Sequence, residues 1–174
     1  MNKRNKIFLM LCGLAALAAG VSSCGYRAGG YKPGALEGKE TAFVEVFTNH
    51  TIQPLLSSQT TAAVCDMLQR DGTYKLASPQ KADFIIRGNI NNITRSSLRT
   101  NPYDSYLSSE VQLTVQMSYQ VIDRRSGKVL MRGSVSGAGS NLSTTGNVQG
   151  AVDNALNSAA IRAAEALVTN LTMP

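Results

Sequence analysis

The chain has 174 residues, 43% of them hydrophobic, and a formal net charge of +6. Lys3, Arg4 and Lys6 supply three of its cations, so the remainder carries 14 basic against 11 acidic residues. So mild an excess gives no support to nucleic-acid binding, and the length suits one domain with a substantial core.

The first 23 residues are typical of an export signal. Three basic residues precede an apolar run from Ile7 to Ala19, and small residues then lead to Cys24. The run is shorter than the roughly 20 residues that span a bilayer, so the pattern predicts a cleaved signal rather than a transmembrane helix. Val21-Ser-Ser-Cys24 resembles the cleavage and acylation site of bacterial lipoproteins. We therefore predict a lipoprotein signal peptide over residues 1–23 and lipidation of Cys24.

Such an anchor would hold the domain at a membrane surface. Residue 25 is Gly rather than the Asp that resembles an inner-membrane retention signal, which favours the outer membrane. The alternative to a lipoprotein is an ordinary secreted protein in which Cys24 is a free thiol. Cys12 would leave with the signal, so Cys65 is the only other cysteine of the mature chain, and it is interpreted as a small buried residue. With His50 as the single histidine, the sequence predicts no metal site and no cofactor.

Residues 24–40 contain five glycines and one proline after the cysteine. This composition predicts a flexible tether, which could reach on the order of 50 Å when fully extended. The folded part is expected to be one α+β domain over residues 41–174.

The first part of this domain is predicted to contain a strand, a helix and a short extended piece. Residues 41–47 are nearly all apolar, which indicates a central strand. A turn is expected over residues 48–51. Apolar residues at helical spacing predict a helix over residues 54–70, ended by Gly72. Residues 73–76 could form a short extended piece.

The middle of the chain is predicted to form three longer strands. Residues 82–93 place Phe84, Ile86 and Ile90 on one face, and the polar residues 94–105 are interpreted as a loop. From Val111 to Val121 apolar and polar residues alternate without a break, which predicts a strand with one dry and one polar face. A hairpin turn at Gly127 leads to the return strand over residues 128–136.

The end of the chain is predicted to be a loop followed by a long helix. Residues 137–146 are rich in Gly, Ser, Thr and Asn, and an alanine-rich helix extends from about Asn147 to Leu171. The order is β-α-β-β-β-α. We expect a two-layer α+β sandwich in which two helices pack on one face of a mixed four-stranded sheet and leave the other face open.

No catalytic motif stands out. The sequence contains no Gly-x-Ser-x-Gly, no phosphate-binding loop and no His-Glu-x-x-His. Glu110 and Asp123 are too far apart along the chain to suggest a paired-carboxylate mechanism. We therefore expect a binding module rather than an enzyme.

Four segments resemble the lipopolysaccharide-assembly lipoprotein family (LptE-like): Cys24-Gly-Tyr26, Phe43 to Asn49, Ala82 to Gly88, and Asp123 to Leu130. The resemblance implies an outer-membrane lipoprotein that faces the periplasm. It implies a partner, the translocon barrel LptD, which the protein would help to assemble and would plug, so aiding insertion of lipopolysaccharide into the outer leaflet. Similar short motifs occur in other periplasmic lipoproteins. The alternative is an LpoB-like activator that docks on a peptidoglycan synthase, although a longer disordered tether would favour that class.

The candidate site residues lie on the expected polar sheet face. Arg87, Lys128 and Arg132 could share that face and meet the phosphates of an anionic glycolipid, because guanidinium groups match phosphate geometry. A solvated face, or contacts with a barrel wall, would explain the same residues. Arg95 and Arg99, in the expected loop, are weaker candidates.

Overall fold

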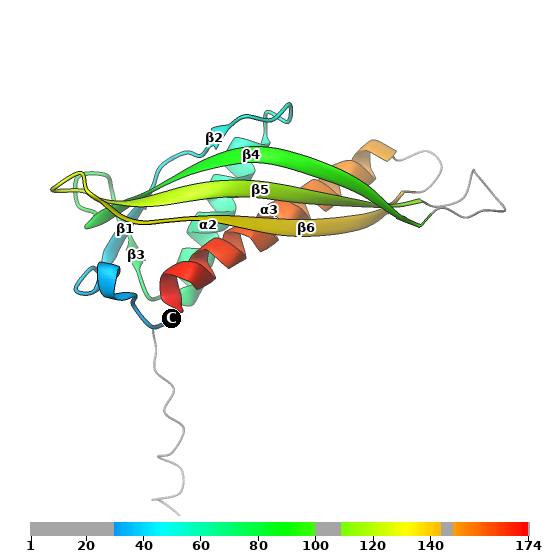
Figure 1. Cartoon of the computed structure of the whole chain (residues 1–174). Helices are drawn as coiled ribbons and strands as arrows, with labels where there is room; N and C mark the ends of the chain where they lie inside the picture. Colours follow the sequence, from blue (N-terminus) through cyan, green and yellow to red (C-terminus); the bar gives the residue numbers. More distant parts are fainter. Residues whose placement is uncertain (1–29, 100–108, 144–147, 174) are drawn as a thin grey trace, which may run out of the picture.

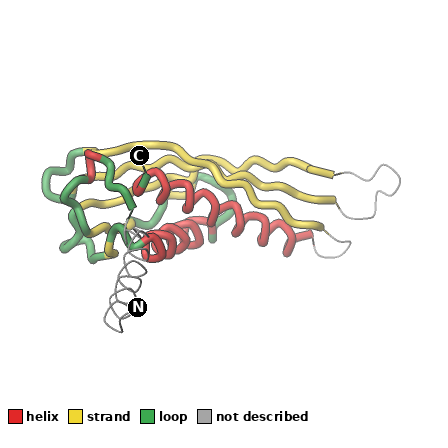
Figure 2. The backbone as a smooth tube through the Cα atoms, turned by 90° about the horizontal axis from the view of Figure 1, so that it is seen from below, coloured by secondary structure: helices red, strands yellow, loops and turns green. Residues whose placement is uncertain are grey.

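The computed structural model describes residues 30–99, 109–143 and 148–173, which form two layers (Figure 1). One layer is a sheet and the other contains two helices, both on the same face of the sheet (Figure 2). The predicted α+β sandwich is therefore confirmed. In chain order the elements are η2 (Gly34–Leu36), β1 (Thr41–Val44), β2 (Thr48–Asn49), α2 (Leu56–Asp71), β3 (Lys75–Leu76), β4 (Phe84–Arg99), β5 (Ser109–Asp123), β6 (Val129–Ser143) and α3 (Val148–Thr172).

The sheet has six strands where four were predicted. Its order is β3-β1-β4-β5-β6, and β2 continues the line of β1 along β4. The two additional strands are two residues long, too short for an alternation pattern to reveal. The predicted turn over residues 48–51 is wrong at its first two residues. The extended piece at residues 73–76 is confirmed at its last two residues, which form β3. β1 pairs with β4 in parallel and β5 with β6 antiparallel, as expected.

Two of the three long strands, β4 and β6, extend well beyond their predicted ends. β4 remains paired with β5 as far as Arg99, so the first six residues of the predicted loop 94–105 are strand. β6 remains paired to Ser143, so most of the predicted loop 137–146 is strand as well. Gly137 and Gly139 explain the second error, because an added Cβ at either position would lie 2.2 Å from backbone atoms of α3. Here glycine permits close packing of strand and helix rather than a loop.

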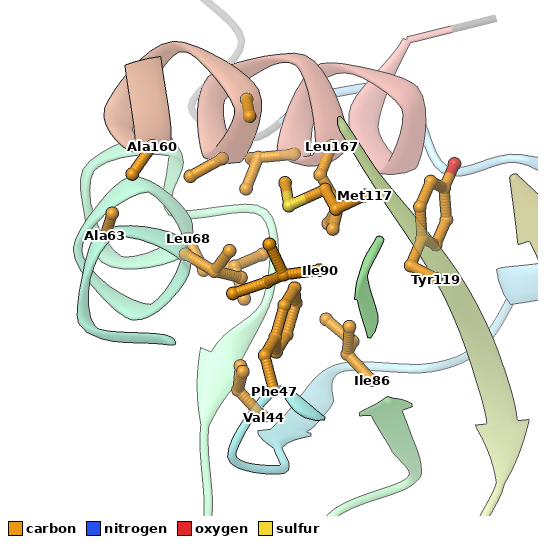
Figure 3. Close-up of a cluster of buried hydrophobic side chains, with 14 of the residues drawn as sticks. Val44, Phe47, Ala63, Leu68, Ile86, Ile90, Met117, Tyr119, Ala160 and Leu167 are labelled. Carbon is orange, nitrogen blue, oxygen red and sulfur yellow. The ribbon is translucent and has the colours of Figure 1, made fainter. Parts of the chain in front are cut away.

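The core lies between the dry sheet face and the two helices (Figure 3). α2 ends at Gly72, whose φ of 74° is the left-handed cap expected from the sequence. α3 has alanines on the side that meets the sheet and α2, and Ala63 of α2 faces Ala160 of α3 in the close-up. Ile90, Met117 and Leu167 are fully buried in the same cluster. Among the described residues, no helix is long and apolar enough to cross a membrane.

Residues 30–41, which we call the strap, mostly fell within the predicted tether but pack on the domain. Leu36 is fully buried, and Gly30 donates a backbone hydrogen bond to Thr73 Oγ1 at 2.5 Å. At the other end Lys39 forms an ion pair with Asp123. Leu36 is the only large aliphatic residue among many glycines, which is why composition alone suggested a free tether.

Two carboxylates hold the end of the strap. The Lys39 ammonium, together with the Ser126 backbone N–H and hydroxyl, holds the pKa of Asp123 well below its usual range. Hydrogen bonds from the Glu40 backbone N–H and from Thr41 lower the pKa of Asp83. Both groups thus bind protons less readily in the folded state than in the unfolded state.

Asp123→Asn is expected to destabilise the protein at pH 7. Because the folded pKa of Asp123 lies below its unfolded value of about 3.9, its stabilising effect is present above that pH and is lost as the pH falls through the folded value. The difference in urea midpoint between wild type and variant should therefore shrink below about pH 4. Lys39→Met should show the same narrowing. A difference that stays constant from pH 7 to pH 3 would contradict this role of the ion pair.

Candidate functional site

The sheet face away from the helices is the candidate site, and we call it the polar face. Side chains at alternate positions of β4, β5 and β6 lie on this face. The register of the strands places these side chains in rows that cross the sheet. The first row joins Arg87, Gln120 and Arg132, the second Asn89, Ser118 and Ser134, and the third Asn92, Gln116 and Ser136.

The first row brings two of the three predicted cations together. Arg87 of β4 and Arg132 of β6 both pair with Gln120 on the strand between them, and all three are exposed. Adjacent strands are about 4.8 Å apart, so the two arginine Cα atoms lie about 10 Å apart on one face. Two guanidinium groups flanking an amide can contact a single phosphorylated headgroup.

Arg87 already has a partner, because its Nε donates to Glu45 Oε2 at 2.7 Å. The two side chains are 54% and 43% exposed. Ion pairs this open to solvent contribute about 0–1 kcal/mol to stability, so exchange of the carboxylate for a phosphate costs little. Among the described ion pairs none includes Arg132.

Lys128 lies apart from this row. It follows the turn at Gly127, whose φ of 68° is left-handed as expected, and precedes the first residue of β6. A bulge at the start of β6 pairs Val129 with Ile122 and Met131 with Val121, so the simple alternation used for Lys128 does not hold across it. Lys128 is exposed and lies at the hairpin opposite Asp123, whose N–H donates to the Lys128 carbonyl at 2.8 Å, and it is not part of the rows of the polar face.

A second bulge makes a depression in the polar face. Between Ile90 and Asn92 the register of β4 against β5 shifts by one residue, which leaves Asn91 as the extra residue. Its side chain donates to Ser118 Oγ at 3.2 Å. The depression has a volume of about 300 Å³, and its polar lining comes from Asn91, Gln116, Ser134 and Ser136. Amides and hydroxyls of this kind both donate and accept hydrogen bonds, as sugar hydroxyls require.

Sequence reasoning missed a second cavity, on the helix side of the sheet. It has a volume of about 460 Å³ and lies beside β4, just past the end of β2. Arg95 lines it, because the residue lies on β4 and not in a loop. The available signal was the absence of any Gly or Pro between Gly88 and Pro102. The remaining lining residues are His50, Thr51, Ile52, Gln53, Asn91, Asn92, Ile93, Leu113, Val152 and Leu156.

Cys65 is the free cysteine among the described residues. Burial raises the pKa of the Cys65 thiol, with a further contribution from Asp66, which disfavours the thiolate. No group of three or more His, Cys, Asp or Glu side chains in the described ranges could hold a metal ion. Cys24 and the segment up to residue 29 lie outside the described residues, so the anchor stays a prediction.

Comparisons with known proteins bear on the whole domain. The family model for lipopolysaccharide assembly, LptE, matches residues 40–171, and no curated protein matches the chain. Two solved structures, a protein from Xanthomonas campestris and a hypothetical protein from Chlamydia trachomatis, are similar with a TM-score of 0.53 and 10% identity. They cover 79% and 76% of this chain and 86% and 95% of their own chains.

A PelC structure from Paraburkholderia phytofirmans is similar with a TM-score of 0.50 and 16% identity, over 82% of this chain and 94% of that one. At such low identity these three structures support the fold alone.

Proposed function

The chain belongs to the LptE family of lipopolysaccharide-assembly proteins, and from this premise we propose that it is an outer-membrane lipoprotein, anchored through Cys24 and facing the periplasm. Its proposed role is to assist assembly of an LptD-like translocon barrel, to plug that barrel, and to aid insertion of lipopolysaccharide into the outer leaflet. The direct ligand in this proposal is lipopolysaccharide, and the protein partner is the barrel.

The polar face is the observation that carries this proposal. Helices cover one face of the sheet (Figure 2). The other face presents rows of amide and hydroxyl groups beside Arg87 and Arg132. Sugar hydroxyls and phosphates are the groups that such a surface can bind. None of the described helices covers it, so it is also available to the wall of a barrel.

The strap supports a position close to the membrane. Gly30 is held on the domain by its hydrogen bond to Thr73. Gly30 is six positions beyond Cys24, and six fully extended residues span about 20 Å at most. An anchor at Cys24 would therefore hold the domain within about 20 Å of the membrane. This reach fits a membrane-embedded partner better than a distant peptidoglycan synthase, the alternative.

The anchor is tested by Cys24→Ala. Since this residue is the only acylation candidate at the predicted cleavage site, the variant should lose labelled fatty acid and should leave the membrane fraction almost completely. Cys65→Ala, at the other cysteine of the mature chain, should keep both label and membrane association. Equal labelling of wild type and Cys24→Ala would contradict the lipoprotein assignment.

Ligand binding is tested by reversing the charges of the first row. Arg87→Glu with Arg132→Glu should weaken binding of the purified full-length protein to lipopolysaccharide by about tenfold or more, because two phosphate partners become repulsive. Added salt should weaken wild-type binding in the same direction. Arg70→Glu with Arg162→Glu is the matched control, since these exposed arginines lie on the helices.

The outcome also separates two versions of the role. If the polar face mainly contacts the barrel, the double variant will bind lipopolysaccharide normally but will co-purify with less barrel. If lipopolysaccharide binding and barrel recovery are both unchanged, Arg87 and Arg132 have no part in either.

A further inference from the structure

The outer edge of β4 changes character where β2 ends. β1 and β2 pair with β4 as far as Asn49 and Ile90, and the His50 N–H donates to the Ile90 carbonyl at 3.0 Å. Beyond this bond β4 continues to Arg99, paired only with β5 among the described strands. The backbone from Asn91 to Arg99 is thus an open sheet edge, directly in line with β2 (Figure 1). Such an edge is a template for an additional strand.

The cavity missed by sequence reasoning lies beneath this edge. Ile93 of β4 and Leu113 of β5 come from the sheet, and Val152 and Leu156 come from α3. No residue of α2 lines the cavity, so α2 leaves this part of the dry face uncovered. Ile52 borders the cavity with 94% of its surface exposed. A strand added to β4 would direct every second side chain toward the helices and so into this space.

The lining of the cavity contains a cation but no carboxylate. Arg95 lines the cavity beside His50, and the lining contains no Asp or Glu. In the described part of the chain no ion pair includes Arg95. A segment that fills the cavity would therefore be stabilised by a carboxylate positioned to meet Arg95.

The opposite edge strand, β6, differs along its glycine-rich part, and a separate cavity of about 770 Å³ lies beside its residues Met131 to Gly133. Beneath Gly137 and Gly139 of β6 the backbone of α3 passes so close that even a Cβ would clash with it. The helix thus occupies the volume directly beneath this part of β6. The Asn91–Arg99 edge of β4 combines unpaired backbone groups with room for the side chains of an added strand.

We propose that the Asn91–Arg99 edge of β4 and the cavity beneath it bind an extended segment of a partner protein by strand addition. The segment carries apolar side chains at alternate positions and a carboxylate that pairs with Arg95. The Ile93 N–H, which now donates to Asn92 Oδ1 at 2.8 Å, would donate to the added strand instead. The inference rests on the proposed function only for the expectation of a protein partner.

Photocrosslinking of the full-length lipoprotein in native membranes tests this inference. Benzoylphenylalanine is placed at Ile52, beside the cavity, and in a matched control at Val46, an aliphatic residue that is 67% exposed and outside the cavity lining. Ile52 should give a protein adduct that maps by mass spectrometry to one segment with alternating apolar residues and an acid. Val46 should give at least about fivefold less of it.

Charge reversal gives the decisive second measurement. Arg95→Glu should lower the Ile52 adduct severalfold, and changing the acid of the mapped segment to lysine should restore it. Adducts with lipid only, equal yields at Ile52 and Val46, or no effect of Arg95→Glu would overturn the inference. A mapped segment in a protein other than an outer-membrane barrel would support strand addition and contradict the proposed partner instead.

Discussion

Replacement of Val115 by aspartate is expected to destabilise the fold severely. Val115 lies at the middle of β5 with no exposed surface, between Ile93 on β4 and Gly137 on β6. An aspartate here would bury a carboxylate among apolar side chains without a partner, at a cost of about 4 kcal/mol or more. A domain of this size is stabilised by roughly 5–15 kcal/mol, so the cost removes much or all of the margin.

The neighbouring residue provides the control for Val115→Asp. Gln116 is exposed on the polar face, so Gln116→Lys should change the free energy of unfolding by no more than about 0.5 kcal/mol. Urea denaturation followed by circular dichroism measures both variants. Similar midpoints for the two would contradict the assignment of the faces of β5.

Gly137→Ala is expected to cost about 3 kcal/mol, an unusually large loss for the addition of one methyl group. An ideal Cβ at this position lies 2.2 Å from the Ala159 carbonyl oxygen and 2.2 Å from the Ala163 nitrogen. Backbone atoms of a helix cannot rotate away, so α3 must shift as a unit and lose contacts with the sheet.

Gly34→Ala is the matched control, because no atom lies within 4 Å of its Cβ position. Its urea midpoint should stay near that of the wild type. If Gly137→Ala also unfolds at the wild-type midpoint, the close packing of α3 on β6 is wrong.

The sequence was most informative where one face of an element is buried. The alternation from Val111 to Val121 predicted the two faces of β5, and helical spacing ending in Gly72 predicted α2. Residues 94–99 and 137–143 were missed because both are polar or glycine-rich, so no period of two in hydrophobicity marks them as strand. The strap was missed because its packing depends mainly on Leu36.

The part of the candidate site that depends on strand alternation was also predictable from the sequence. Arg87 and Arg132 share a row because strand register follows from the alternation, and both were expected on the polar face. The bulges at Asn91 and Leu130 have no signature in the sequence. The first creates the depression in the polar face, and the second disturbs the alternation used to place Lys128. Arg95 was predicted to lie in a loop. Residues 94–96 of β4 are all exposed, so no alternation of apolar and polar residues marks them as strand.

Purification of the full-length protein from native membranes in a mild detergent tests the central claim most directly. The protein should carry a tag at its C-terminus, and co-purified proteins should be identified by mass spectrometry. The account predicts a stoichiometric outer-membrane β-barrel together with lipopolysaccharide, and loss of both when Cys24→Ala releases the domain. Recovery of a peptidoglycan synthase in place of the barrel would contradict it.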